Sequence, residues 1–122
     1  MYFFIFILGG TAYNILEYIW RGYTHWTMTI AGGICLTGIY AICTLTGLNY
    51  IYKVVTCAAF ITAIEFISGL IINKYFKLNV WDYSDIPYNI LGQICPRYSV
   101  LWLALCIPVV AVIDVISSLY TR

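Results

Sequence analysis

Four windows of about 20 mostly apolar residues constrain the fold of this chain more than any other feature of its sequence. They cover residues 2–20, 28–47, 54–72 and 99–119. In a bilayer every backbone polar group must be satisfied within the protein, and windows of this length suit helices far better than tilted strands. We therefore expect an all-α integral membrane protein in which residues 1–122 form a single transmembrane domain.

The composition also indicates a lipid environment. Hydrophobic residues make up 63% of the 122 residues and charged residues only 9%, whereas a soluble domain carries about 25% charged residues. The formal net charge is +1 and there is no run of basic residues, so nothing indicates a nucleic-acid partner. The first window lacks the positively charged segment that opens a signal peptide, and we expect it to be the first span.

Five cysteines lie within or beside the apolar windows. Their spacing fits neither a zinc site nor a secreted disulfide framework. We expect small buried side chains at these positions, and we predict neither a metal site nor a cofactor. The five are Cys35, Cys43, Cys57, Cys95 and Cys106.

The connection between the third and fourth windows is long and polar. We call its main part, NVWDYSDIPYNILGQICPRY (residues 79–98), the polar elbow. Two interpretations of its tail stay open. Residues 86–95 form an interfacial or re-entrant helix with Asp85 as N-cap and Pro87 in the first turn, or the fourth span begins near Pro87 and bends at Pro96.

An even number of spans places both ends of the chain on one side of the membrane. That side carries two basic residues and the elbow side carries four. They are Lys53 and Arg122 on the side of the termini, and Arg21, Lys74, Lys77 and Arg97 on the side of the elbow. The positive-inside rule therefore favours a cytoplasmic elbow with both termini outside, while so small a difference leaves dual orientation open.

The sequence also contains signs of an internal repeat. At a constant offset of 60 residues, YTHWTMTIAGGIC (23–35) aligns with YSDIPYNILGQIC (83–95). At an offset of 48 residues, EYIWRG at Glu17 resembles EFISG at Glu65. A unit of two spans returns to its starting side, so its copy keeps the same orientation. We expect two parallel helix pairs related by an axis along the membrane normal.

Acidic residues inside apolar windows are candidate functional groups, because a charge at the centre of a spanning helix is costly. Glu17 lies near the end of the first window and Glu65 inside the third. The functional interpretation is a proton- or cation-titrating pair, which requires the two to converge. The structural alternative is a glutamate that pairs with Arg21 or hydrogen-bonds to a neighbouring helix. Asp114, nearer the end of its window, is expected to reach the headgroups.

Other polar and aromatic residues are predicted on the same side and complete a candidate substrate- or ion-binding site at the ends of spans one and three. The predicted site residues are Glu17, Glu65, Arg21, His25, Trp81, Asp82, Tyr83, Ser84, Asn89 and Gln93. Trp26 and Asn73 are expected on this side too. An aromatic cage for a cationic ligand is favoured only at Trp81 and Tyr83, which adjoin acids. No residue is predicted to be catalytic.

Several motifs together resemble a known family. LNVWDYSDIPYNILGQIC followed by YSVLW, with LEYIWRGYTHWTMTIAGG and TAIEFISGLIIN, is similar to the putative type IV ABC-transporter membrane protein family over nearly the whole chain. The resemblance implies a small four-span protein of the bacterial plasma membrane. No phosphate loop of the G-x-x-x-x-G-K-[ST] type occurs in the sequence, so an ATPase would have to be a separate chain.

These observations favour a transport-related membrane subunit that acts as a homodimer, with other membrane subunits, or with a separate ATPase. One alternative is a self-contained small cation or drug exporter or channel. A less favoured one is an intramembrane lipid-modifying enzyme using Asp82, Asp85 or His25, and a purely structural assembly partner is the last. No nucleotide-binding or catalytic motif is present, so the interpretation leans away from an enzyme.

Overall fold

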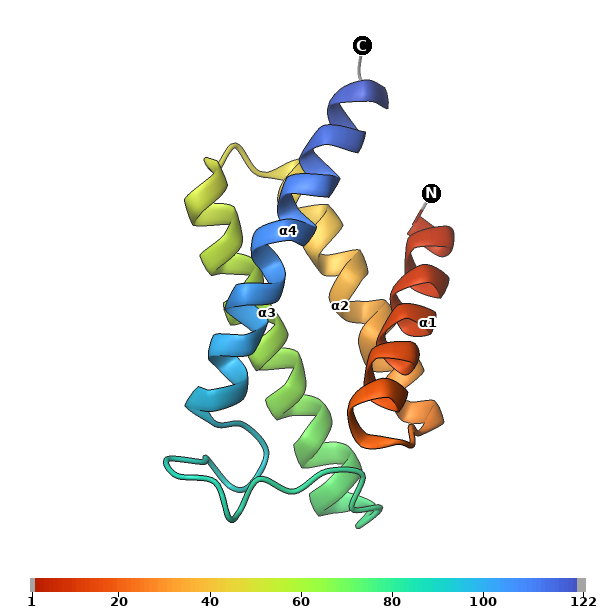
Figure 1. Cartoon of the computed structure of the whole chain (residues 1–122), viewed down its shortest axis with the longest axis vertical. Helices are drawn as coiled ribbons and strands as arrows, with labels where there is room; N and C mark the ends of the chain where they lie inside the picture. Colours follow the sequence, from red (N-terminus) through yellow and green to blue (C-terminus); the bar gives the residue numbers. More distant parts are fainter. Residues whose placement is uncertain (1, 121–122) are drawn as a thin grey trace.

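The computed structural model describes residues 2–120, and within them the fold is all-helical with no strand. The elements are α1 (Tyr2–Arg21), α2 (Trp26–Leu45), α3 (Tyr50–Gly69), a π-helical continuation η1 (Leu70–Tyr75) and α4 (Pro96–Tyr120) (Figure 1). The four long helices, α3 counted together with η1, are long and apolar enough to cross a membrane, which confirms the four predicted spans. Arg122, which entered the predicted charge asymmetry, lies outside the described residues.

Polar caps make α2 and α3 begin earlier than hydropathy predicted, at Trp26 and Tyr50 rather than at residues 28 and 54. His25 Nδ1 accepts a hydrogen bond from the Thr27 N–H at 3.2 Å, and Asn49 Oδ1 accepts one from the Tyr52 N–H at 3.1 Å. Each cap satisfies a backbone donor that the first helical turn leaves unpaired. Hydropathy locates the apolar stretch, whereas the capping residue sets where the helix starts.

Glycines allow α1 and α2 to pack backbone to backbone. A Cβ atom added to Gly9 would lie 2.7 Å from the Gly32 carbonyl oxygen, and one added to Gly10 would lie 2.5 Å from that of Thr29. The glycine pairs of these two helices therefore serve helix packing. Gly69 instead leaves room for the side chain of Gln93, which comes from the elbow.

The main apolar core lies among α2, α3 and α4. Its buried members are Ile39, Cys43, Val54, Cys57, Ala58, Ile61, Cys106 and Val110. All five cysteines are unpaired, and each is buried or partly buried, as expected. At one end of this core the Lys53 ammonium lies 3.0 Å from Asp114 Oδ1. Asp114, which was expected to reach the headgroups, therefore forms a salt bridge between α3 and α4.

The chain termini and the elbow lie at opposite ends of the molecule. α1 begins and α4 ends at the same end, together with the short α2–α3 turn (Figure 1). The α1–α2 turn and the elbow lie at the opposite end, where residues 76–95, which include most of the elbow, connect η1 to α4 (Figure 1). This arrangement matches the chain path that four spans require.

The elbow forms turns rather than the predicted helix. Its tail contains one isolated antiparallel bridge between Ile90 and Ile94, whose N–H···O distance is 2.9 Å. No helix starts at Asp85, and α4 begins at Pro96, so the predicted helix and the predicted earlier start of the fourth span were both wrong. The interfacial or re-entrant position of the segment stays a prediction. Tyr88 and Leu91 have φ angles of 62° and 54°, in the left-handed region that a right-handed helix of L-residues cannot contain.

Candidate functional site

Glu65 is the point at which α3, α4 and the elbow meet. Its Oε2 accepts a hydrogen bond from the Tyr83 hydroxyl at 2.9 Å, and its Oε1 accepts one from Trp102 Nε1 at 3.2 Å. Tyr83 belongs to the elbow and Trp102 to α4. Both donors are neutral, and the ion pairs formed among residues 2–120 do not include Glu65.

Aromatic rings surround these two donors. The Tyr83 ring stacks on Tyr98 with centroids 4.7 Å apart and planes within 8°, and Tyr13 of α1 contacts Trp102 with centroids 6.1 Å apart. Burial raises the pKa of the Tyr83 phenol, and the neighbouring Glu65 carboxylate raises it further. Tyr83 therefore keeps its proton at neutral pH and remains a donor to Glu65.

Glu17 has a different environment. Its buried carboxylate lies 3.0 Å from Arg21 Nη2, one turn further along α1, and accepts a hydrogen bond from the Thr24 hydroxyl at 3.2 Å. The guanidinium compensates the charge of Glu17 within its own helix. This pair matches the structural alternative that the sequence offered for Glu17.

Arg21 also ties α1 to the elbow. Its Nη1 donates to the Val80 carbonyl oxygen at 2.9 Å, and the guanidinium lies 4.5 Å from the centre of the Tyr23 ring. The contact of Nη2 with Glu17 is an ion pair rather than a well-directed hydrogen bond, because Nη2 and Nε are both buried with no acceptor in line within the described part of the chain. One side chain thus contacts both an acid and the elbow backbone.

Aromatic side chains connect α1, the helix that carries Glu17, to Glu65. Tyr13 lies one turn before Glu17 on α1 and contacts Trp102, which donates to Glu65. Within residues 2–120 no hydrogen bond joins the two carboxylates directly. Glu17 and Glu65 are therefore compensated by different partners, Arg21 and Thr24 for the first and Tyr83 and Trp102 for the second.

Trp81 and Gln93 form the buried base of the elbow. Trp81 Nε1 donates to the Gln93 carbonyl oxygen at 3.1 Å, and Gln93 Oε1 accepts from Asn73 Nδ2 at 2.8 Å. Asn73 Oδ1 in turn accepts from the Val80 N–H at 2.7 Å. Asn73 lies in η1, and its three-residue network fastens the elbow to the end of α3.

The remaining predicted residues shape turns at some remove from Glu65. Asp82 is exposed and accepts a hydrogen bond from the Ser84 N–H at 2.9 Å, which lowers the pKa of the Asp82 carboxyl. Asn89 accepts from the Gly92 N–H at 2.9 Å and donates to two elbow carbonyls. His25 caps α2. These contacts hold the backbone of the loops and involve neither glutamate.

Trp102, Tyr98 and Tyr13 were missing from the prediction, and Asn73 was expected on this side but not among the predicted site residues. Trp102 and the two tyrosines look in the sequence like the aromatic residues that gather at membrane surfaces. Asn73 gave a usable signal, since an amide at the end of an apolar window needs a partner. The other three could not be predicted from the sequence, because only the folded structure brings them near Glu65 from other segments.

Chemically, the Glu65 cluster is suited to exchange a proton or hold a cationic group. A carboxylate that accepts one hydrogen bond on each oxygen retains lone pairs for either. Within the described residues no group of three histidine, cysteine, aspartate or glutamate side chains is arranged to hold a metal ion.

Comparison with protein families places these features in context. A family model described as "Putative ABC-transporter type IV" matches residues 1–122, which confirms the resemblance carried by the sequence motifs. The comparisons with curated proteins and with solved structures returned no match. The matched range includes all four helices and the polar elbow.

Proposed function

Because this chain belongs to the Putative ABC-transporter type IV family, we propose that it is a transport-related membrane subunit whose intramembrane proton- or cation-accepting group is Glu65. One observation carries the proposal. Glu65 is held by two neutral donors, whereas Glu17 is paired with Arg21. An acid placed in a spanning helix without a cationic partner is a functional candidate by default.

The elbow is the element that responds to the charge on Glu65. Tyr83 donates to the carboxylate from the elbow, and a hydrogen bond to a charged group contributes about 1.5–3 kcal/mol. When Glu65 takes up a proton or a cation, the charge-assisted part of this bond is lost. We propose that the elbow is thereby released at the cytoplasmic mouth, with the Arg21–Val80 contact as its second tie to the helices.

Membership of this family suggests that the chain works with partner chains. The sequence carries no phosphate loop, so ATP hydrolysis would come from a separate chain. Four spans are few for a complete pathway, and we propose a homodimer or a complex with other membrane subunits in the bacterial plasma membrane.

A second candidate function follows from the rings near Glu65. Tyr83, Tyr98 and Trp102 place three aromatic side chains beside one carboxylate. Such surroundings favour an organic cation, which aromatic faces attract. This would make the chain a self-contained exporter of cationic compounds.

Infrared difference spectroscopy of the reconstituted chain tests the titration of Glu65 without knowledge of the transported molecule. We expect the carbonyl stretch of a protonated carboxylic acid to grow as the pH is lowered. Glu65→Gln removes the component of this band that comes from Glu65, whereas the matched variant Glu17→Gln, which changes the acid that lies 3.0 Å from Arg21, retains that component. A band that is lost equally in both variants, or that is lost only in Glu17→Gln, would overturn the assignment.

A further inference from the structure

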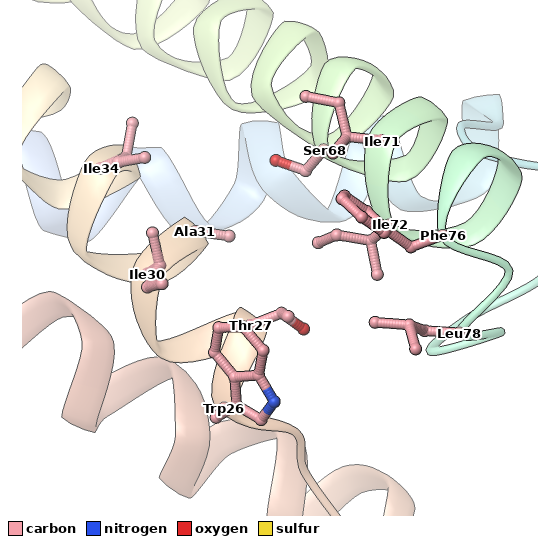
Figure 2. Close-up of a pocket in the computed structure, with 10 residues that line it drawn as sticks. All are labelled: Trp26, Thr27, Ile30, Ala31, Ile34, Ser68, Ile71, Ile72, Phe76 and Leu78. Atoms are coloured by element: carbon pink, nitrogen blue, oxygen red, sulfur yellow. The ribbon is translucent and has the colours of Figure 1, made fainter.

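A groove of about 300 Å³ lies between α2 and the end of α3, at the elbow end of the molecule. Trp26, Ile30 and Ile34 of α2 line one side (Figure 2). Ile71 and Phe76 line the other side, with Leu78 from the start of the connection that leads to the elbow (Figure 2). The groove is separate from the hydrogen bonds of Glu65, since none of these residues takes part in them.

The lining is apolar and faces outward. Thr27 and Ser68 are the two lining residues with polar side chains. Ile30, Ile71 and Phe76 remain between 46% and 60% exposed, so the groove is not closed by the helices that form it. It runs along helices that are long and apolar enough to span a membrane, where its surroundings are lipid chains. Water gains few hydrogen bonds in such a groove.

Two lysines belong to the chain segment that forms one side of the groove. The exposed Lys77 stands between Phe76 and Leu78, both of which line the groove, and Lys74 lies three residues earlier in η1. Lys74 acts electrostatically on the exposed Asp82, whereas the ion pairs formed among residues 2–120 do not include Lys77. The N-terminus of α2 adds the positive end of a helix dipole beside Trp26.

We propose that this groove binds an anionic phospholipid of the surrounding bilayer. One acyl chain lies between α2 and η1, and the phosphate lies at the elbow end against Lys77. Trp26, which is 66% exposed at that end, contacts the lipid where chain and headgroup meet. The occupant follows from charge complementarity, because an apolar groove alone would take any acyl chain, whereas an exposed lysine between two residues of its wall favours a negative headgroup.

Quenching of Trp26 fluorescence by brominated lipids tests this proposal. The chain, in a Trp20→Phe background, is reconstituted into vesicles of equal phosphatidylglycerol and phosphatidylcholine, with bromine on the acyl chains of one lipid or the other. The difference between this protein and its Trp26→Phe variant isolates the signal of Trp26. We expect brominated phosphatidylglycerol to quench Trp26 more strongly than brominated phosphatidylcholine.

Two pairs of variants locate the site. Lys77→Ala should lower the preference for phosphatidylglycerol about fivefold, whereas Arg97→Ala removes the same charge from α4, which contributes no lining residue, and should leave the preference unchanged. Ile34→Phe partly fills the groove and should reduce quenching, and Ile15→Phe on the exposed face of α1 should not.

Three results would overturn the proposal. Equal quenching by the two lipids would mean ordinary contact with the bilayer. Protection of Trp26 from both lipids would mean that a protein, such as a second copy of this chain, covers the groove. A preference that persists unchanged in Lys77→Ala and Ile34→Phe would place the lipid elsewhere.

Discussion

At the scale of single residues, the two glutamates of α1 and α3 illustrate how a buried charge is compensated. Glu17 has a guanidinium one turn away on its own helix, and this spacing is visible in the sequence. Glu65 depends on Tyr83 and Trp102, which lie 18 and 37 residues away along the chain. The first environment could be predicted from helical periodicity. The second could not, because it requires knowing which segments fold onto α3.

The Tyr83–Glu65 hydrogen bond leads to a prediction about stability. Tyr83→Phe removes the donor but keeps the ring that stacks on Tyr98, so the loss of stability comes mainly from the hydrogen bond. We expect the free energy of unfolding to fall by about 1.5–3 kcal/mol. The measurement is denaturant unfolding in mixed lipid–detergent micelles, followed by tryptophan fluorescence.

Tyr88→Phe is the matched control for this prediction. Tyr88 belongs to the same elbow and is 86% exposed, so the same loss of a hydroxyl should change the free energy by less than about 0.5 kcal/mol. In a double-mutant cycle, Tyr83→Phe should cost less once Glu65→Gln is present. Fully additive effects would show that the two side chains do not interact in the folded protein.

At the scale of elements, the end of α3 holds the elbow in place. η1 continues α3 as a π-helical turn, and such turns are frequently found at functional sites. Asn73 of η1 satisfies the buried Val80 N–H and the side chain of Gln93. Val80 lies seven residues after Asn73 and Gln93 lies 20 residues after it. The two hydrogen bonds therefore hold both the early and the late part of the elbow against one helix.

Asn73→Ala therefore tests how the elbow is fastened. The substitution leaves the Val80 N–H and Gln93 Oε1 without their partner, at a cost of about 1–3 kcal/mol for each buried group. We expect hydrogen–deuterium exchange of residues 80–95 to become faster, while α1 and α2 exchange as before. Tyr75→Ala, at a neighbouring position of η1 where the side chain is 78% exposed, should leave the elbow unchanged. An elbow that exchanges normally in Asn73→Ala, or exchange that rises equally in every helix, would contradict this role.

The elements also show what sequence reasoning could reach. The four spans were predictable because lipid requires long apolar helices, whatever their tertiary contacts. The start of α2 was misplaced by two residues because His25 extends the helix through its cap. The elbow helix was wrong because the side chain of Asn89 holds turns around it, with left-handed residues at Tyr88 and Leu91. The internal repeat stays a prediction.

At the scale of the whole molecule, the orientation in the membrane decides which compartment the elbow faces. The elbow and the α1–α2 turn share one end, and the α2–α3 turn lies at the other (Figure 1). The elbow end carries Arg21, Lys74, Lys77 and Arg97, of which Arg21 is paired with Glu17. The positive-inside rule counts lysine and arginine irrespective of nearby acids, so the pairing of Arg21 does not weaken the expectation of a cytoplasmic elbow.

Cysteine labelling of intact cells tests this orientation with two variants placed at opposite ends. Ser84→Cys lies in the exposed part of the elbow, and Gly47→Cys lies in the α2–α3 turn, where a side chain meets no atom within 4 Å. An impermeant thiol reagent should label Gly47→Cys directly, and Ser84→Cys only after the cells are permeabilised. The unsubstituted protein gives the background, which should be low because four of its cysteines are buried and Cys35 is partly buried.

The reverse pattern would place the elbow outside the cell, and partial labelling of both variants in intact cells would mean that the chain inserts in two orientations. Either outcome would remove the cytoplasmic mouth from the proposed mechanism while leaving the chemistry of Glu65 to be judged by its own titration.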